Sequence, residues 1–315
     1  MDQPIVSICI PTFNRAQQLK KTLESIVVQD EFKNNLVEVV ISDNASIDNT
    51  QELCKEYSLK YSNVKYFKNT ENVRDANFPL AISRASGILR KLHNDTLLLQ
   101  PNALRKLCDL TEKHKETKPC IFLSNGSCNN VAEGSLNFRD FAVSVGFHVT
   151  WIASFTIWGD ECANIENDLA GCDLRLWQVR KFYENAFKKD TVIVSNYLFG
   201  IGQIVPQKDI SYGLYTVFYE NYMLLLSPYI SNNALNVLDV ETIERDLLYN
   251  FFTSWIIQWE INRRFYHYSE SENLKECVFK QYKEKTYWPD YQRYYTKKVF
   301  RAKIKRMIKV LLRRN

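Results

Sequence analysis

The sequence predicts an α/β protein with a mostly parallel, Rossmann-like central sheet flanked by helices and a helical C-terminal region. Over the first hundred residues, short runs rich in Val and Ile alternate with amphipathic stretches, which is typical of βαβ units. After about residue 211, aromatic residues at helical spacing dominate. We therefore expect an α/β domain over residues 1–210, a helical subdomain over 211–296 and a basic amphipathic helix over 297–315.

The composition is that of a globular protein. The chain has 315 residues, of which 45% are hydrophobic and 24% charged, and this balance excludes disordered and fibrous proteins. The 8 cysteines form no CxxC pair, and we expect no secretory leader. A reducing cytoplasm is therefore expected, with neither a disulfide framework nor a zinc module.

The expected elements follow one another in a regular order. The run from Ile5 to Ile10 predicts a first strand that stops at Pro11, and residues 15–28 have the apolar spacing of a helix. The remaining expected elements are strands at 37–42, 64–67, 88–92, 120–124 and 150–158, and helices at 48–57 and 77–86. The strand at 150–158 is apolar enough to be placed centrally in the sheet.

Two uncharged stretches are long enough to be weighed as membrane spans. Residues 141–159 contain several Ser, Thr and Gly residues and one His, and residues 191–207 contain Asn, Gln, Gly and Pro. Such polar content opposes insertion into hydrocarbon, so a buried strand is the expectation for the first stretch and no span is expected in either.

Polar loops follow three of the expected strands: Pro11–Arg15, Asp43–Ser46 and His93–Thr96. The carboxyl ends of parallel strands share one edge of a sheet, and ligands of open α/β folds bind there. The sequence has no GxGxxG after the first strand and no GxxxxGK[ST], which argues against a dinucleotide fold and a P-loop NTPase. No GxSxG or HExxH motif occurs either.

Four segments in this order carry a family resemblance. They read IVSICIPTFNR at 5–15, VVISDNASIDNT at 39–50, YFKNTENVRDANF at 66–78 and ASGILRKLHNDTLLLQPNAL at 85–104. Together they resemble the inverting nucleotide-sugar glycosyltransferases of family 2, which have the GT-A fold. The first two segments are the most specific part of the resemblance.

The resemblance implies a set of donor-binding residues. The first two loops would hold the nucleotide base and ribose, and Asn72 and Asn77 would lie near the ribose and phosphates, although Arg74 stands where a Gly is usual. The residues of the first two loops are Pro11, Thr12, Asn14, Arg15, Asp43 and Asn44. The alternative for Asp43 and Asn44 is a purely structural role, because such residues commonly shape turns.

The metal motif of the family corresponds to His93-Asn94-Asp95-Thr96, which has a single carboxylate. A nucleotide diphosphate needs a hard divalent cation, Mg²⁺ or Mn²⁺, and both prefer oxygen ligands. Asp95 is therefore the expected metal ligand, helped through water by Asn94 or Thr96, with an ordinary surface Asp as the alternative. His93 is either an extra ligand or a structural residue.

An inverting transfer also needs a general base, usually a carboxylate. The resemblance places this base after the strand at 150–158, near the start of the following helix. Asp173 is preferred because Asp173-Leu174-Arg175-Leu176-Trp177 is similar to the base-bearing helix of the family, although Ala170-Gly171 replaces the expected acidic pair. Asp168 and Glu161 are the alternatives.

The resemblance thus implies a metal-dependent glycosyltransferase of the hexosyltransferase type, which moves a sugar from a nucleotide diphosphate, with UDP expected, to a glycan hydroxyl. The implied setting is bacterial surface polysaccharide synthesis, O-antigen or capsule, on a lipid-linked acceptor. One alternative is a sugar nucleotidyltransferase, which should have a Gly-rich basic loop that PTFNR lacks. The other is a catalytically silent relative that binds glycan or acts as a scaffold. The single carboxylate of the metal motif favours this alternative.

The tail over 297–315 has cations and no acid. The apolar residues Phe300, Ile304, Met307, Ile308, Leu311 and Leu312 share one helical face. We expect this helix to bind an anionic membrane surface, placing the protein peripherally on the cytoplasmic face of the inner membrane, and no nucleic-acid partner is expected. The alternatives are a solvated helix docked on its own domain and an RNA-binding tail.

Overall fold

The computed structural model describes residues 3–128, 134–202, 212–261 and 273–312. The chain divides into two compact units, Met1–Ile204 and Val205–Asn315. The boundary expected at residue 210 lies outside the described residues, and the one expected at 296 falls inside a single continuous helix.

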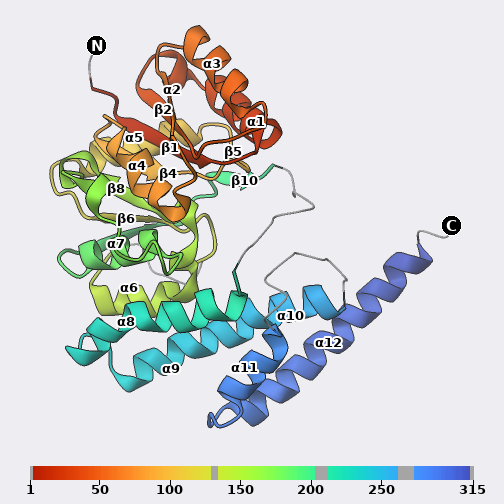
Figure 1. Ribbon diagram of the computed structural model, residues 1–315. Helices are drawn as coiled ribbons and strands as arrows, with labels where there is room; N and C mark the ends of the chain where they lie inside the picture. Colours follow the sequence, from red (N-terminus) through yellow and green to blue (C-terminus); the bar gives the residue numbers. More distant parts are fainter. Residues whose placement is uncertain (1–2, 129–133, 203–211, 262–272, 313–315) are drawn as a thin grey trace. The chain divides into compact units, whose positions relative to one another are not determined.

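A five-stranded sheet with the order β3-β2-β1-β4-β8 forms the centre of the first unit (Figure 1). Its strands are β1 (Val6–Thr12), β2 (Val37–Asp43), β3 (Val64–Lys68), β4 (Leu89–Leu92) and β8 (Thr156–Trp158). The strands β1 to β4 are mutually parallel, and β8 runs antiparallel to β4. The mostly parallel central sheet predicted from the sequence is confirmed.

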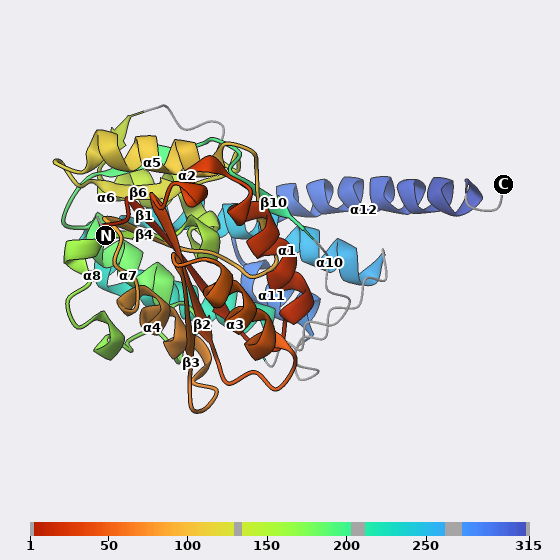
Figure 2. The same cartoon turned by 90° about the horizontal axis from the view of Figure 1, so that it is seen from above.

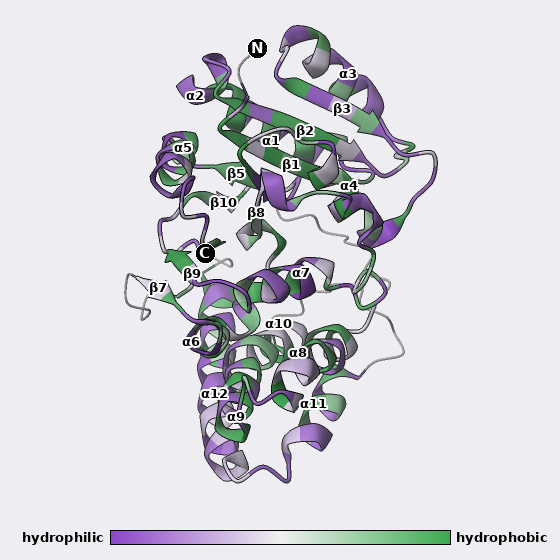
Figure 3. Cartoon of the chain, turned by 90° about the vertical axis from the view of Figure 1, so that its left-hand side faces the viewer, coloured by the Kyte–Doolittle hydropathy of each residue, from purple (hydrophilic) through white to green (hydrophobic). Residues whose placement is uncertain are grey.

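Helices cover both faces of this sheet, so β1 and β2 are buried on both sides. Helices α1 (Ala16–Val27) and α3 (Thr50–Lys60) lie on one face and α4 (Asn77–Ser83) on the other (Figures 1 and 2). Side chains alternate between the faces along each strand, so Ile8 and Ile10 pack into the same core as Leu19 and Leu23 of α1. Figure 3 shows the resulting hydrophobic residues along β1 and β2.

Shorter elements complete the first unit. They are the helices α2 (Asp30–Lys33), α5 (Ala103–His114), α6 (Phe138–Val145) and α7 (Trp177–Ala186), and the small sheets β10-β5 (Phe199–Ile201, Leu97–Leu99) and β6-β9-β7 (Cys120–Leu123, Thr191–Val194, Ser135–Leu136). Because β10 pairs with β5, the end of the first unit returns to the segment just after Asp95.

The stretch 141–159 differs from the prediction. Its first residues belong to α6, only Thr156–Trp158 form a strand, and this strand is last in the order of the five-stranded sheet instead of central. The backbone N–H groups of Trp151, Ser154 and Phe155 donate to carbonyls three residues earlier, so they are unavailable to a strand ladder. No helix among the described residues has the length and apolarity needed to cross a membrane.

The second unit is helical where it is described. Its helices are α8 (Tyr222–Ser231), α9 (Val237–Asp246), α10 (Thr253–Glu260), α11 (Leu274–Tyr282) and α12 (Trp288–Leu311). Tyr219, Tyr222, Tyr282 and Tyr291 are buried in its core. Of the aromatic residues around Tyr219, Tyr222 is buried as well, whereas Tyr215 and Phe218 are half-buried.

Candidate active site

The polar loops meet at the carboxyl edge of the parallel strands. Thr12 at the end of β1 lies opposite Asp43 at the end of β2, so β1 ends two residues after the predicted last residue, Ile10. The N–H of His93, which follows β4, donates to the carbonyl of Cys9 in β1, so the next residues Asn94 and Asp95 come out beside Thr12. The structure thus brings the three predicted loops together.

The first two loops are tied to each other by hydrogen bonds. Asn14, with φ 52°, receives a bond on its Oδ1 from the N–H of Ile47 and donates its own N–H to Ser46 Oγ, both at 2.9 Å. The N–H of Ala16 donates to Asp48 Oδ2 at the start of α1. Asn14 therefore holds the first loop against the second, while Phe13 beside it stays exposed.

Asp43 is fully buried, and both of its carboxylate oxygens accept hydrogen bonds. Oδ1 accepts from the N–H of Ser46 at 2.9 Å, and Oδ2 accepts from the hydroxyl of Tyr66 at 2.8 Å. Burial, followed by the neighbouring Asp43 carboxylate, raises the pKa of Tyr66. The turn-shaping role considered for Asp43 is thus present in the structure.

A network of amide side chains holds the loop over residues 72–76. Asn44 donates to Asn72 Oδ1 at 2.7 Å and accepts from the N–H of Val73, whereas Asn77 donates to the carbonyl of Ser42. Asn77 is buried and connects the loop to β2 through Ser42, whereas Asn72 is exposed. Arg74 has φ 53°, a conformation that favours glycine, which explains the Gly expected there.

One member of this network, Arg84, had no signal in the sequence. Arg84 donates to Ser42 Oγ at 2.6 Å and to Asn69 Oδ1 at 2.8 Å, and the guanidinium lies over the ring of Phe67. Burial lowers the pKa of Arg84. A cation at the end of α4 resembles any surface Arg in sequence, and only the fold places it under the loop.

Asp95 is buried and both of its carboxylate oxygens have partners. Arg15 Nη1 donates to Oδ1 at 2.8 Å, and Thr12 Oγ1 donates to Oδ2 at 2.9 Å. The carbonyl of Asp95 accepts from Thr22 Oγ1 of α1 at 2.9 Å. Neighbouring Asn94 has a buried Oδ1 with no hydrogen-bond partner among the described residues.

His93 has a structural role. Its Nδ1 lies 3.1 Å from Lys91 Nζ and its Nε2 lies 3.1 Å from the carbonyl of Leu97, so both ring nitrogens are engaged. Burial, followed by the charge of Lys91, lowers the pKa of His93 well below its usual value. Of the two roles considered for His93, the structure favours the structural one.

Lys91 is a fully buried cation beneath the same loop. Burial lowers its pKa to about 7, its Nζ donates to the carbonyl of Leu92 at 2.9 Å, and it lies 4.6 Å from the ring centroid of Phe199. The amide of Asn125 bonds the backbone N–H and carbonyl of Phe199 and so fixes this ring. In the sequence Lys91 lies within an expected strand, and no motif marks it as a functional residue.

The oxygen donors of the loop suit a hard cation. Asp95 supplies one carboxylate and Asn94 one unpartnered amide oxygen, and Mg²⁺ binds through one or two carboxylates together with substrate phosphates. No cluster of three or more His, Cys, Asp or Glu side chains suited to a metal occurs in the described part of the chain. The residues therefore fit a cation that arrives with a diphosphate better than a metal held by protein alone.

The three candidate bases lie in different surroundings. Asp173 is exposed, just ahead of α7, and neighbouring Arg175 forms an ion pair with Asp75 of the 72–76 loop, with Nη1 and Oδ1 3.0 Å apart. This ion pair places the Asp173 segment against the loop at the carboxyl edge.

Asp168 and Glu161 are both held in ion pairs. Asp168 contacts Arg180 and Lys181; burial alone would raise its pKa, but hydrogen bonds from these cations lower it. Glu161 pairs with Lys189 and follows β8, which runs antiparallel to β4, so it lies at the edge opposite Asp95. The structure does not bring Glu161 to the predicted loops.

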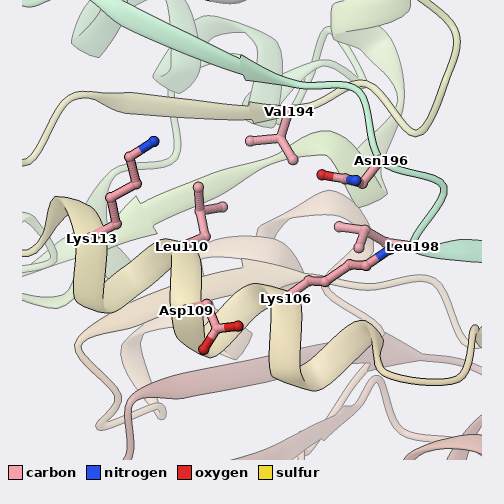
Figure 4. Close-up of a pocket in the computed structure, with 7 residues that line it drawn as sticks. All are labelled: Lys106, Asp109, Leu110, Lys113, Val194, Asn196 and Leu198. Carbon is pink, nitrogen blue, oxygen red and sulfur yellow. The ribbon is translucent and has the colours of Figure 1, made fainter.

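A pocket elsewhere in the first unit is separate from this edge. Leu110 and Lys113 of α5 point towards the strand that carries Val194, and Lys106 extends towards Leu198, whereas Asp109 points away from them (Figure 4). None of the residues that line this pocket belongs to the three loops. We therefore assign the candidate active site to the carboxyl edge.

Comparison with known proteins finds a family that matches the segment containing the three loops. The model of glycosyl transferase family 2 matches residues 7–156. The abequosyltransferase RfbV of Salmonella typhimurium is 40% identical over 85 residues, 26% of this chain and 25% of that protein. A Campylobacter jejuni relative, GalNAc(5)-diNAcBac-PP-undecaprenol beta-1,3-glucosyltransferase, is 31% identical over 137 residues, 42% of this chain and 41% of that protein.

Solved structures show the same fold at low sequence identity. S. aureus TarS 1-349 in complex with UDP-GlcNAc has a TM-score of 0.56 at 16% identity, covering 81% of this chain and 76% of that one. Mannosyltransferase PcManGT from Pyrobaculum calidifontis, in complex with GDP-Man and Mn²⁺, has a TM-score of 0.52 at 14% identity, covering 100% and 89%. The matches to the two curated relatives span less than half of those proteins. Residues 7–156 of this chain match glycosyl transferase family 2, and the unit that contains them has the GT-A fold.

Proposed function

We propose that this protein is an inverting glycosyltransferase that moves a sugar from a UDP-sugar to a glycan hydroxyl. The observation that carries the proposal is the convergence of Thr12, Asp43 and Asp95 at the carboxyl edge within the segment that matches the family. The TarS complex contains UDP-GlcNAc, which supports a nucleotide-sugar donor at this edge.

The donor would lie across the three loops. Pro11, Thr12, Asn14, Asp43 and Asn44 would form the base and ribose side, and Asn72 the rim towards the sugar. Asp95 with Asn94 would hold a Mg²⁺ or Mn²⁺ ion, which supplies charge neutralisation for the diphosphate as it leaves. The Mn²⁺ in the PcManGT complex supports this use of a divalent cation.

Inversion requires one displacement in which the acceptor oxygen attacks the anomeric carbon from the face opposite the diphosphate. The base removes the proton of the attacking hydroxyl, and the diphosphate leaves with the bonding electrons. We assign this base to Asp173, because it is exposed and its segment contacts the donor loop through Arg175 and Asp75. Asp168 is less suited because two cations already occupy its carboxylate.

The proposed acceptor is a lipid-linked glycan of bacterial surface polysaccharide synthesis, O-antigen or capsule. The name of the Campylobacter relative includes an undecaprenol-linked acceptor, which supports this class of substrate. An acceptor of this kind lies at a membrane surface, so the protein should bind there, at the cytoplasmic face of the inner membrane.

Helix α12 supports attachment to that surface. Phe300, Met307, Ile308, Leu311 and Leu312 are between 48% and 72% exposed, although apolar. Figures 1 and 2 show the C-terminal half of α12 extending past α10 and α11. Exposed apolar side chains among Lys and Arg residues suit the interface of an anionic bilayer. Arg313 and Arg314 lie outside the described residues.

The proposal is tested by incubating the protein and a lipid-linked glycan acceptor with a panel of UDP-, GDP- and dTDP-sugars, with and without Mn²⁺ or Mg²⁺, beside parallel reactions that contain nucleoside triphosphates and sugar 1-phosphates. A glycosyltransferase releases the nucleoside diphosphate from one donor and needs the cation. A nucleotidyltransferase instead releases pyrophosphate from a nucleoside triphosphate and a sugar 1-phosphate. A catalytically silent relative releases neither, and this result would reject the proposed activity.

A further inference from the structure

The charges around Asp95 balance without a metal ion. Arg15 Nη1 lies 2.8 Å from Asp95 Oδ1, and Thr12 Oγ1 donates a hydrogen bond to Asp95 Oδ2. The Asp95 side chain is 2% exposed. A divalent cation therefore finds this carboxylate already neutralised, and it must displace Arg15 before it can bind.

We propose that Arg15 makes cation binding at Asp95 conditional on the nucleotide diphosphate. In the donor-free protein Arg15 holds Asp95; when the donor arrives, Arg15 turns to the diphosphate and Asp95 takes the cation. The inference rests on the proposed function, since it assumes a nucleotide diphosphate at this edge.

The charge count favours this exchange. A cation alone would leave a displaced guanidinium beside a divalent ion in a partly buried site, where like charges repel strongly. A diphosphate brings two negative charges, so Arg15 and the cation together balance Asp95 and the donor. The guanidinium is also suited to this contact, because its planar fork matches phosphate oxygens.

The local structure permits the Arg15 side chain to move while its backbone stays. The side chain is 28% exposed, and its hydrogen bond within the described residues goes to Asp95. The backbone is fixed on both sides, by Asn14 to Ser46 and by Ala16 to Asp48, and the Arg15 carbonyl accepts from Leu19 in the first turn of α1. A rotation about side-chain bonds is therefore enough to exchange partners.

A purely structural ion pair makes a different prediction. If Arg15 only braced the loop, its removal would lower stability and would leave the linkage between cation and nucleotide unchanged. The pair between Arg105 and Glu31 offers a matched comparison, because Arg105 Nε lies 2.6 Å from Glu31 Oε1 and the Glu31 side chain is 7% exposed. Arg105 belongs to α5 and none of the three loops.

The test is calorimetric titration of the full chain with Mn²⁺ alone, UDP alone and Mn²⁺ in the presence of saturating UDP. The proteins compared are the wild type, Arg15→Gln, Arg15→Lys, Asp95→Asn and the control Arg105→Gln. In the wild type and in Arg105→Gln, UDP should raise the affinity for Mn²⁺ by about tenfold or more, within the usual range of coupling between sites.

In Arg15→Gln, Mn²⁺ alone should bind about tenfold more tightly than in the wild type, and UDP should add about threefold or less. Asp95→Asn should bind Mn²⁺ weakly under both conditions. If Arg15→Gln does not fold, Arg15→Lys should show the same direction with a smaller change, because an ammonium lacks the guanidinium fork. Unchanged Mn²⁺ affinity and an intact UDP effect in the Arg15 variants would overturn the inference, whereas a wild type that binds no nucleoside diphosphate would instead count against the proposed function.

Discussion

At the scale of single residues, the two buried carboxylates of the candidate site already have hydrogen-bond partners within the fold. Asp43 bonds Ser46 and Tyr66, and Asp95 bonds Thr12 and Arg15. Such a site is held in shape before the donor arrives, so less ordering is needed on binding. Substitutions here should therefore affect both stability and ligand affinity, and the two effects must be separated.

For Asp43, we predict that Asp43→Ala weakens UDP binding and also lowers the free energy of unfolding by about 1–3 kcal/mol, because two buried donors lose their acceptor. The control Tyr66→Phe removes one of these bonds and keeps the carboxylate. Calorimetry at a temperature where all variants are folded should show lower UDP affinity only in Asp43→Ala. Equal affinities in the wild type and Asp43→Ala would restrict Asp43 to shaping the turn.

The assignment of the base predicts that Asp173→Asn retains UDP affinity while transfer falls by roughly 10²-fold or more, as is usual for a lost general base. Asp168→Asn and Glu161→Gln are measured beside it. Glu161→Gln should transfer sugar normally, because Glu161 follows the antiparallel β8 at the far edge. A large loss of transfer in either comparison variant, with Asp173→Asn active, would move the base to that residue.

Asp168 instead predicts a pH-dependent effect on stability. Since its pKa is lowered in the folded protein, its ion pairs with Arg180 and Lys181 stabilise the protein above the unfolded-state pKa of about 3.9. This contribution is lost as the pH falls through the folded-state value. Asp168→Asn should therefore lower the melting temperature at pH 7, and this difference should shrink progressively as the pH falls below about 3.9. A constant difference across this pH range would contradict the assigned pKa shift.

At the scale of elements, the sequence predicts the first half of the first unit better than the second. Val and Ile runs followed by polar loops gave β1 to β4 nearly residue by residue, because parallel strands buried on both faces have strong local signals. Residues 146–154 form short turns whose hydrogen bonds are local, and an apolar composition cannot distinguish these from a strand. The reversed direction of β8, which places Glu161 at the wrong edge for the three loops, depends on pairing with distant β4.

The sequence also does not predict which side chains the site residues contact. Three loops could be expected at one edge, since they follow parallel strands. The pairing of Arg15 with Asp95 depends on side-chain packing between segments about 80 residues apart. The contact between Lys91 and His93 depends on the burial of a single strand residue. No periodicity or spacing in the sequence encodes these contacts.

Helix α12 gives a prediction about membrane binding. Replacing Phe300, Met307 and Leu311 by Ser should reduce flotation with anionic liposomes, because these side chains are exposed and supply the apolar contact. Deleting residues 297–315 should abolish flotation while Tyr291 stays buried near Thr253 and keeps the start of α12 in place. Binding of the intact protein should weaken at high salt, since its cations contribute.

The matched control for α12 replaces Leu59 and Val237 by Ser. These residues are also exposed and apolar, 89% and 79% respectively, but lie on α3 and α9. Flotation of this control should equal that of the wild type. Equal binding by the deletion variant and the intact protein would remove the support for attachment through α12.

At the scale of the whole molecule, a GT-A unit whose residues 7–156 match family 2 and a helical unit are joined in one chain. The first unit holds the loops proposed to bind donor and cation, and the second ends in the helix proposed to bind the membrane. This division suits an enzyme whose donor is dissolved and whose acceptor is lipid-linked. The central claim is that the first unit transfers a sugar with inversion.

The most direct measurement is ¹H NMR of the complete reaction, with the donor selected from the nucleotide-sugar panel and lipid-linked glycan as acceptor. Our account predicts that the anomeric signal of the donor decays as nucleoside diphosphate forms, and that a product signal of the opposite anomeric configuration grows at the same rate. A product that keeps the configuration of the donor, or no transfer from any donor in the panel, would contradict it.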